Sequence, residues 1–192
     1  AEMADVLRGS DFTQEDWKMA VTILTHPVML ENNHLDNIPK EEARQRVNRQ
    51  IKHALSHPLM QISRMKEEST KFLTRMCYSN LLNISLGTKL GVQVGLFSGS
   101  ILHLGTERHQ HLIPDVESMK IAGCFLMTEL THGSNLKALQ TTATYDPKSE
   151  MFIMNTPNDG AIKWGIGNAA STAVMGTVFA RLITKGKDYG VH

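Results

Sequence analysis

One segment of the chain places several chemically active side chains in succession. Residues 128–135 read Thr-Glu-Leu-Thr-His-Gly-Ser-Asn, directly after an apolar run, and a Thr-rich run that ends at Asp146-Pro147 follows. Glycine followed by serine and asparagine is typical of an ordinary turn. The same residues could present backbone N–H groups to an anion, because glycine lets the main chain approach a phosphate closely. From these residues alone, both interpretations stay open.

The nine histidines raise the question of a metal site. His53 and His57 have the four-residue spacing of one helix face, but no glutamate stands beside them in an HExxH arrangement, and Pro58 interrupts the helix. His109 and His111 are two residues apart and would point to different faces of a helix. We therefore expect surface or helix-end histidines and no metal.

Two other kinds of site are disfavoured by their sequence context. The "HGSN" segment lacks the strand, tight turn and helix that a GxSxG nucleophile requires. The "GIGNAAST" segment at 165–172 has two close glycines, but not the third glycine of a dinucleotide fingerprint or the Lys-Ser/Thr pair of a P-loop. A β-turn is the default interpretation of such a pair.

The composition is that of a folded globular protein. The chain of 192 residues is long enough for one large domain or two small ones, and it is 41% hydrophobic and 20% charged. Twenty basic and nineteen acidic residues leave a net charge of +1, so no global field indicates nucleic acid or an anionic membrane. No apolar run approaches the ~18 residues of a membrane span. Cys77 and Cys124 lack CxxC partners, so we expect buried structural thiols and a reducing compartment.

The first 120 residues have the periodicity of helices. Thr13-Gln14-Glu15-Asp16 is a helix start, and Trp17, Ala20, Val21 and Leu24 follow at three and four residue spacing. Further helices are predicted after Pro39, after Pro58, over residues 86–105 and after Thr106. The inward positions expected after Pro58 are Leu59, Ile62, Met65, Phe72, Leu73 and Met76.

The pattern changes near residue 120. Segments such as "LQTTATYD" at 139–146 and "MFIMNTP" at 151–157 are short, and either alternating or apolar. Asp146-Pro147-Lys148-Ser149 and Asn158-Asp159-Gly160 have the chemistry of hairpin connections. The sequence therefore predicts an α+β protein, with a helical domain over 1–120 and the beginning of an antiparallel, β-barrel-like domain over 121–192.

Three segments together carry a family resemblance. The runs "GCFLMTELTHGSNLKALQTTATYDPKSEMFIMNTP", "IKWGIGNAAST" and "FARLITKGKDYGVH" closely resemble the acyl-CoA oxidase family, within the wider acyl-CoA dehydrogenase fold. They are more similar to its branched-chain and oxidase-like branches than to the straight-chain branch. The match covers about residues 85–192, whereas the first 80 residues match only in helical texture.

The resemblance implies an FAD site with five contact residues. Thr128 would hydrogen-bond the isoalloxazine ring through its backbone and hydroxyl, and Trp164 would lie beside that ring. Gly133 and Ser134 would bring N–H groups and a hydroxyl to phosphate oxygens of FAD or of coenzyme A, and Gly167 would give the backbone room to approach the flavin.

Two residues near this implied site have competing interpretations. A lone tryptophan such as Trp164 is usually a core residue, but its Lys-Trp-Gly context and its spacing from Thr128 favour a flavin neighbour. Glu129 is expected to fix a loop or cap a strand end, and not to act as a catalytic base.

The implied reaction is α,β-dehydrogenation of a fatty acyl-CoA in β-oxidation. A carboxylate base removes the α-proton, the β-hydrogen leaves as hydride to the flavin, and O₂ reoxidises the flavin to give H₂O₂ and trans-2-enoyl-CoA. In the family, the base lies in a C-terminal helical domain that also completes the FAD site across a homodimer interface. This chain stops at "KGKDYGVH" inside the β domain, so we expect no base in residues 1–192 and no oxidase activity from the isolated chain. The family also implies a peroxisomal location.

Two other functions stay open. The "NAAST" run after Gly167 departs from the family's more usual Gly-Lys-Thr, which removes a lysine that could contact a phosphate or a loop. A non-catalytic relative that acts as a binding or regulatory protein would fit that loss. The other alternative is an acyl-CoA dehydrogenase that passes its electrons to an electron-transfer flavoprotein.

Overall fold

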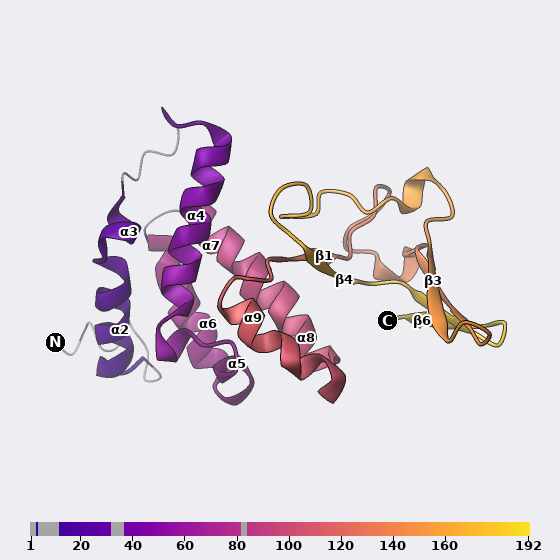
Figure 1. Cartoon of the computed structure of the whole chain (residues 1–192), viewed down its shortest axis with the longest axis horizontal. Coiled ribbons are helices and arrows are strands. Elements are labelled where there is room, and N and C mark those ends of the chain that lie inside the picture. Colours follow the sequence, from indigo (N-terminus) through magenta and orange to yellow (C-terminus); the bar gives the residue numbers. More distant parts are fainter. Residues whose placement is uncertain (1–2, 4–11, 32–36, 82–83) are drawn as a thin grey trace. The chain divides into compact units, whose positions relative to one another are not determined.

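The computed structural model of the chain describes residue 3 and residues 12–31, 37–81 and 84–192. The chain divides into two compact units, Ala1–Gly123 and Cys124–His192 (Figure 1). We call them the helical unit and the strand unit, because the first contains the α-helices and the second contains the main sheet. The predicted fold class, a helical part followed by a β part, is confirmed.

The helical unit is a succession of short and medium helices. Its described α-helices are α2 (Gln14–Leu24), α3 (Pro27–Leu30), α4 (Lys40–Leu55), α5 (Arg64–Glu67), α6 (Ser69–Tyr78), α7 (Ile84–Leu90), α8 (Gly99–Leu104) and α9 (Ile113–Glu117). Short 3₁₀ helices cover Pro58–Met60, Ser79–Leu81 and Glu107–Leu112. A π-helix, Gly91–Ser98, joins α7 to α8. The helix predicted over 86–105 is therefore continuous, but its middle is wound more widely than an α-helix.

Helix α2 begins as predicted. Thr13 is its N-cap: the Oγ1 atom accepts a hydrogen bond from the Asp16 N–H at 3.2 Å, and the Asp16 carboxylate accepts from the Thr13 N–H at 2.9 Å. Such a reciprocal cap satisfies two N–H groups that have no partner within the helix. The threonine at 106 likewise precedes the 3₁₀ helix Glu107–Leu112, where a short helix was predicted.

The buried face of α2 differs from the one that the three and four residue spacing of Trp17, Ala20, Val21 and Leu24 indicates. Trp17 is 45% exposed and Val21 is 42% exposed. The side chains that α2 does bury are Asp16, Met19, Ala20 and Ile23. Asp16 faces the interior because it forms an ion pair there: its Oδ1 atom lies 2.6 Å from Nε of the buried Arg75 on α6.

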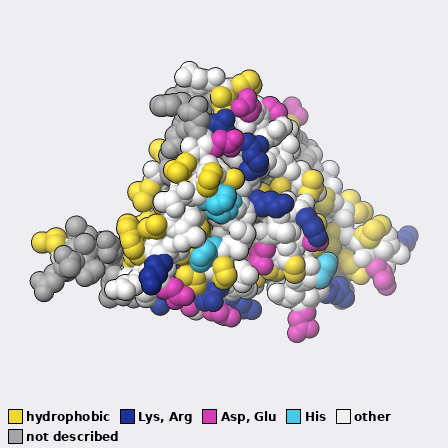
Figure 2. All heavy atoms as spheres, turned by 60° about the vertical axis from the view of Figure 1, so that its left-hand side comes forward, with side chains coloured by type: hydrophobic (Ala, Val, Ile, Leu, Met, Phe, Trp, Pro, Cys, Tyr) yellow, Lys and Arg dark blue, Asp and Glu magenta, His cyan; other side chains and the backbone are white. Residues whose placement is uncertain are grey.

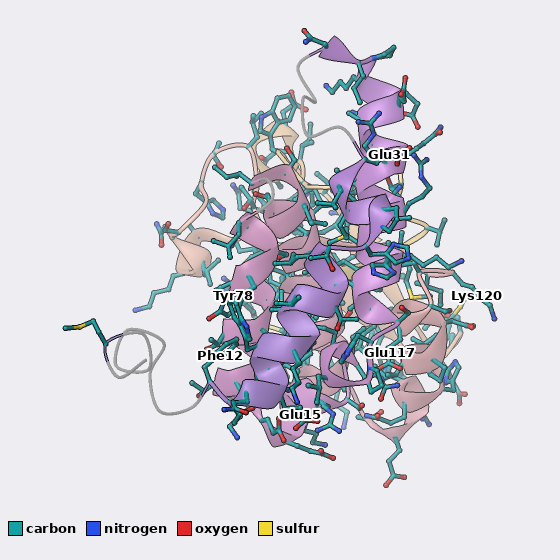
Figure 3. All side chains as sticks on the ribbon, turned by 90° about the vertical axis from the view of Figure 1, so that its left-hand side faces the viewer. Phe12, Glu15, Glu31, Tyr78, Glu117 and Lys120 are labelled. Atoms are coloured by element: carbon teal, nitrogen blue, oxygen red, sulfur yellow. The ribbon has the colours of Figure 1, made fainter. Side chains whose placement is uncertain are left out.

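The core of the helical unit gathers side chains from all of its longer helices. Five of the six inward positions predicted after Pro58 are buried, namely Leu59, Ile62, Met65, Phe72 and Met76. The sixth, Leu73, was wrongly assigned, because it is 52% exposed. At the edge of the core the rings of Phe12 and Tyr78, both labelled in Figure 3, stack with their centroids 4.6 Å apart.

Gln93 of the π-helix holds the start of the first strand. Its Nε2 atom donates to the Ile121 carbonyl at 2.9 Å, and its Oε1 atom accepts from the Gly123 N–H at 2.8 Å. A Cβ atom on Gly123 would lie 2.0 Å from the ring of Phe97. Glycine is therefore required here by close packing, and the wide turn of the π-helix supplies the side chain that orders the strand entry.

The strands in the described part of the chain form two sheets. They are β1 (Gly123–Leu126), β2 (Thr142–Asp146), β3 (Met151–Asn155), β4 (Met175–Val178), β5 (Arg181–Thr184) and β6 (Lys187–Val191). One sheet pairs β1 with β4, and the other has the order β3-β2-β5-β6. The β2–β3 and β5–β6 pairs are antiparallel as predicted, but β2 and β5 run parallel, with Thr142 opposite Arg181.

The two predicted hairpin connections have different outcomes. Asp146 does begin the β2–β3 turn, where its Oδ1 atom accepts from the Lys148 N–H at 3.1 Å. The prediction for Asn158-Asp159-Gly160 was wrong. Asp159–Ala161 is a 3₁₀ turn, and the next strand, β4, begins only at Met175.

Strand β3 is an apolar strand at the edge of the four-stranded sheet (Figure 1). All five of its residues are exposed, and the fractions run from 48% for Met154 to 63% for Met151 among its large apolar side chains. Its ring contact is with Tyr145 of β2, whose centroid lies 5.4 Å from that of Phe152.

The surface carries both signs of charge. On the face shown in Figure 2, Lys and Arg side chains lie among Asp and Glu side chains. In the described parts of the chain, we find no helix with the length and apolar character needed to cross a bilayer. Of the two thiols predicted to be buried, Cys124 is, and burial raises its pKa. Cys77 is exposed, so that prediction was wrong.

Candidate functional site

Two segments of the strand unit pair along a short antiparallel bridge. The Trp164 N–H donates to the Thr128 carbonyl at 3.1 Å, and the Leu130 N–H donates to the Ile162 carbonyl at 2.9 Å. Between these bonds, Glu129 lies opposite Lys163. Thr128 and Trp164, two of the residues predicted for a flavin site, are thus brought side by side from distant parts of the sequence.

Side chains along this bridge alternate between two faces, as they do in extended strands. We define the outer face as Thr128, Leu130, Ile162 and Trp164, all of which are exposed. Trp164 is the most exposed of its large apolar side chains, at 59%. The alternative that Trp164 is a core residue is therefore wrong.

The inner face of the bridge carries a buried ion pair. The side chains of Glu129 and Lys163 are 0% and 11% exposed, and Oε1 lies 3.3 Å from Nζ. We call these two residues the inner pair. They lie next to Thr128 and Trp164 in sequence and on the opposite side of the same backbone.

Five hydrogen bonds surround the Glu129 carboxylate. Oε1 accepts from the Thr141 N–H at 2.8 Å, from the Thr141 hydroxyl at 2.5 Å and from Nζ of Lys163. Oε2 accepts from the Gln140 N–H at 2.8 Å and lies 3.0 Å from Nε2 of His132. Because an ionised carboxylate has no proton to donate, the hydrogen of that last bond belongs to the imidazole.

These bonds determine the charge state of Glu129. Burial raises the pKa of its carboxyl group, but the hydrogen bonds from Thr141 and Gln140 and the charge of Lys163 outweigh burial and lower the pKa to about 2. A buried carboxylate of such low basicity is a poor proton acceptor. The prediction that Glu129 fixes a loop is confirmed by these contacts, and its exclusion as a base stays a prediction.

Lys163 joins three backbone segments. Its Nζ atom donates to the Met127 carbonyl at 3.0 Å and to the Phe179 carbonyl at 2.8 Å, in addition to Glu129. Burial lowers the pKa of Lys163, and the charge of Glu129 partly offsets that effect. Three acceptors match the three N–H groups of an ammonium ion, so this buried charge is well satisfied.

The Gly133-Ser134 turn follows directly from the bridge. A Cβ atom on Gly133 would lie 4.0 Å from Cγ2 of Thr128, so the turn begins beside the outer face. Gly133 and Ser134 are both exposed, and the Leu136 N–H donates to the Ser134 carbonyl at 3.0 Å. The loop returns to the interior at Leu139, which is 1% exposed.

Gly167 is not drawn into this group. It lies in an exposed turn in which the Asn168 carbonyl accepts from the N–H groups of Ser171 and Thr172. Of the two glycines in the "GIG" run, Gly165 is the one that takes a left-handed conformation, with φ +66°, immediately after Trp164. The structure therefore brings Thr128, Gly133 and Trp164 together and leaves Gly167 in the next turn.

Two residues of this arrangement were not predicted. The alternation of side chains along a strand places Lys163 on the other face from Trp164, so Lys163 could have been suspected. Its partner, Glu129, is far away in the sequence. Gly165 stands beside Gly167 in the "GIG" run, and only the backbone angle distinguishes the two.

Two comparisons with known proteins, one of sequences and one of solved structures, point to the same family. No family model matches the chain. Acyl-coenzyme A oxidase 3 of Yarrowia lipolytica is 36% identical over 195 residues, which cover 99% of this chain and 27% of that protein. The crystal structure of acyl-CoA oxidase 3 from the same organism superimposes with a TM-score of 0.78 at 35% identity, over 95% of this chain and 26% of the other. The chain belongs to the acyl-CoA oxidase family.

Other acyl-CoA oxidases match in the same way. The peroxisomal acyl-coenzyme A oxidase 2 of Arabidopsis thaliana is 48% identical over 133 residues, which are 66% of this chain and 19% of that protein. Acyl-CoA oxidase 1 of the same plant superimposes with a TM-score of 0.65 at 27% identity, over 95% of this chain and 27% of the other. The chain thus spans between about a fifth and about a quarter of the length of these oxidases.

Proposed function

We propose that the outer face of the bridge is the flavin-facing part of an FAD-dependent acyl-CoA oxidase. The whole protein would convert a fatty acyl-CoA to the trans-2-enoyl-CoA while O₂ is reduced to H₂O₂, in fatty acid β-oxidation. The observation that carries this proposal is Trp164, in a chain of the oxidase family: its side chain is 59% exposed, and its backbone N–H donates to the Thr128 carbonyl.

The residues present fit the cofactor. A planar, largely apolar ring needs an exposed apolar surface with polar groups at its edge, and the outer face offers Leu130, Ile162 and Trp164 beside the Thr128 hydroxyl. A phosphate needs close N–H and hydroxyl donors, and the exposed Gly133-Ser134 turn begins beside Thr128. Bound FAD supplies the acceptor for the hydride that leaves the β-carbon.

Each of the five residues then has a definite task. Thr128 donates hydrogen bonds to the polar edge of the ring, and Trp164 covers the ring and keeps water away from it. Gly133 and Ser134 bind phosphate oxygens of FAD or coenzyme A, and Gly167 leaves room for the cofactor beyond the tryptophan. Glu129 holds no substrate proton, because its carboxylate is buried and its pKa is about 2. We place the base that takes the α-proton outside residues 1–192.

The partners and location follow from the same proposal. The whole protein would bind a fatty acyl-CoA and O₂ and would form a homodimer. We place it in the peroxisome, because a relative 48% identical over 133 residues is named a peroxisomal oxidase.

A binding experiment on the purified chain tests the cofactor assignment. The chain is incubated with excess FAD, passed through a gel-filtration column and examined for flavin absorbance. We expect bound flavin in the wild-type chain, and less of it in Trp164→Ala and Thr128→Ala. Tyr189→Ala is the matched control, because it removes another exposed ring of the strand unit. Equal retention by all four chains would contradict the assignment.

The reaction itself is tested on the whole protein. With a fatty acyl-CoA and O₂ supplied, we expect equal amounts of enoyl-CoA and H₂O₂. Enoyl-CoA formed only when an electron-transfer flavoprotein is added would indicate the dehydrogenase instead, and flavin binding without either product would indicate a non-catalytic relative.

A further inference from the structure

We propose that Glu129 and Lys163 are positioning residues for the cofactor, acting from the inner face of the bridge on the two parts of the site. Lys163 positions Thr128 and Trp164, the part of the site that we call the ring side. Glu129 positions Gly133 and Ser134, the part that we call the phosphate side. This inference rests on the proposed function, because it concerns the same flavin site.

The ring side depends on Lys163 through its neighbours. Its Nζ atom binds the Met127 carbonyl, one residue before Thr128, and its own backbone continues directly into Trp164. A third bond, to the Phe179 carbonyl, fixes the ammonium against the segment between β4 and β5. One buried group therefore determines where both Thr128 and Trp164 stand.

The phosphate side depends on Glu129 in the same way. Oε2 binds His132, the residue before Gly133, and also the N–H of Gln140, while Oε1 binds Thr141. The loop that carries Gly133 and Ser134 is thus held at both of its ends by a single carboxylate. Since Glu129 also pairs with Lys163 at 3.3 Å, the positions of the ring side and the phosphate side are coupled.

Stability alone is a weak reason for such a pair. Burying two charges costs desolvation that their attraction only partly repays, and apolar replacements of similar size are often tolerated. Binding and catalytic groups, in contrast, must be held to within about 0.5 Å. A charge pair whose hydrogen bonds reach Met127, His132, Gln140, Thr141 and Phe179 is suited to that second task.

The test uses Trp164 as its own reporter. The chain contains two tryptophans, so Trp17→Phe leaves the fluorescence of Trp164 alone. In this background we compare wild type, Glu129→Gln, Lys163→Met and the double variant, which removes both charges. Thr141→Val is a milder variant that deletes one bond to Glu129, and Tyr189→Ala is the matched control. Urea unfolding identifies the conditions in which each variant is folded.

The first measurement needs no ligand. Anisotropy and acrylamide quenching report how firmly Trp164 is held. We expect higher mobility in the folded Lys163→Met and double variants than in wild type and Tyr189→Ala. Unchanged mobility of Trp164 in these folded variants would overturn the proposal, whether or not the chain binds FAD.

The second measurement compares FAD with riboflavin, which has the ring but no phosphate. We expect Glu129→Gln and Thr141→Val to weaken FAD binding by about tenfold or more and riboflavin binding much less, while Lys163→Met weakens both. Equal loss for the two ligands in Glu129→Gln would contradict the division of roles. If the wild-type chain binds neither ligand, these 192 residues do not form the cofactor site by themselves, and the mobility measurement still decides whether the pair positions Trp164.

Discussion

The buried carboxylate of Glu129 makes the stability of the strand unit depend on acid in a predictable way. Hydrogen bonds from Thr141 and Gln140 and the charge of Lys163 overcome the effect of burial and lower its pKa from 4.5 to about 2. The unfolded chain therefore binds this proton more readily than the folded chain does. The stabilisation is fully present above the unfolded pKa of 4.5, and it is lost as the pH falls through the window from 4.5 to about 2.

The size of the effect follows from the same values. A difference of roughly 2.5 pKa units corresponds to about 3 kcal/mol at 1.4 kcal/mol per unit. About 2 kcal/mol of this would already be lost at a pH of about 3. The assay is urea unfolding followed by Trp164 fluorescence in Trp17→Phe, at a series of pH values.

The variants isolate the contribution of Glu129 from other acidic groups. In Glu129→Gln this pH-dependent loss should be absent, so the gap in unfolding free energy between wild type and variant should narrow by about 2 kcal/mol as the pH falls to about 3. Thr141→Val removes one hydrogen bond to the Glu129 carboxylate and one to the Ala161 carbonyl, and it should reduce the slope without abolishing it. Glu150→Gln, which alters an exposed carboxylate of the same unit, is the control. A gap that stays constant with pH would refute the assigned role of these hydrogen bonds.

Three further predictions concern the helical unit. Arg75→Met leaves the buried Asp16 carboxylate without its 2.6 Å partner and should lower the free energy of unfolding, measured in urea, by about 3–5 kcal/mol. An equal loss in the exposed-site control Arg49→Met would contradict this reasoning. Burial lowers the pKa of His53 and of His57, so the unfolded chain takes up protons first, and stability should fall as the pH drops below about 6.5. Melting curves of His53→Gln should show a smaller fall in stability over this pH range. An identical fall would exclude His53 as a source of the pH dependence. Gly123→Ala places a Cβ 2.0 Å from the Phe97 ring and should lower the free energy of unfolding by about 1–3 kcal/mol, and an unchanged thermal midpoint would show that the ring moves aside freely.

Local chemistry in the sequence was enough to place several elements. The Thr13 cap, the helix start after Thr106 and the Asp146 turn depend on residues within three positions of one another, and the structure confirms all three. Such features are predictable because their hydrogen bonds close within a single turn of chain.

Features that depend on distant partners were missed. The inward rotation of Asp16 needs Arg75 on another helix, so periodicity alone wrongly placed Trp17 and Val21 inside. The parallel pairing of β2 with β5 depends on the path of the chain between them, which composition does not reveal.

The candidate site shows the same limit. Motif spacing pointed to Thr128 and Trp164, and in the structure the Trp164 backbone N–H donates to the Thr128 carbonyl at 3.1 Å. The pairing of Glu129 with Lys163 could not be recognised, because the two residues stand in separate segments and only the fold brings Oε1 to 3.3 Å from Nζ. The flavin contacts of the five predicted residues remain predictions.

The most direct test of the account is a titration of the Trp17→Phe chain with FAD, with Trp164 emission as the signal. If the outer face binds the flavin, FAD should quench the emission up to a plateau at saturation. Riboflavin in excess should compete with FAD for the same site. Thr128→Ala should shift the midpoint to higher FAD concentration. Quenching that rises linearly without saturation, and equally in Thr128→Ala, would contradict the assignment of this face to the cofactor.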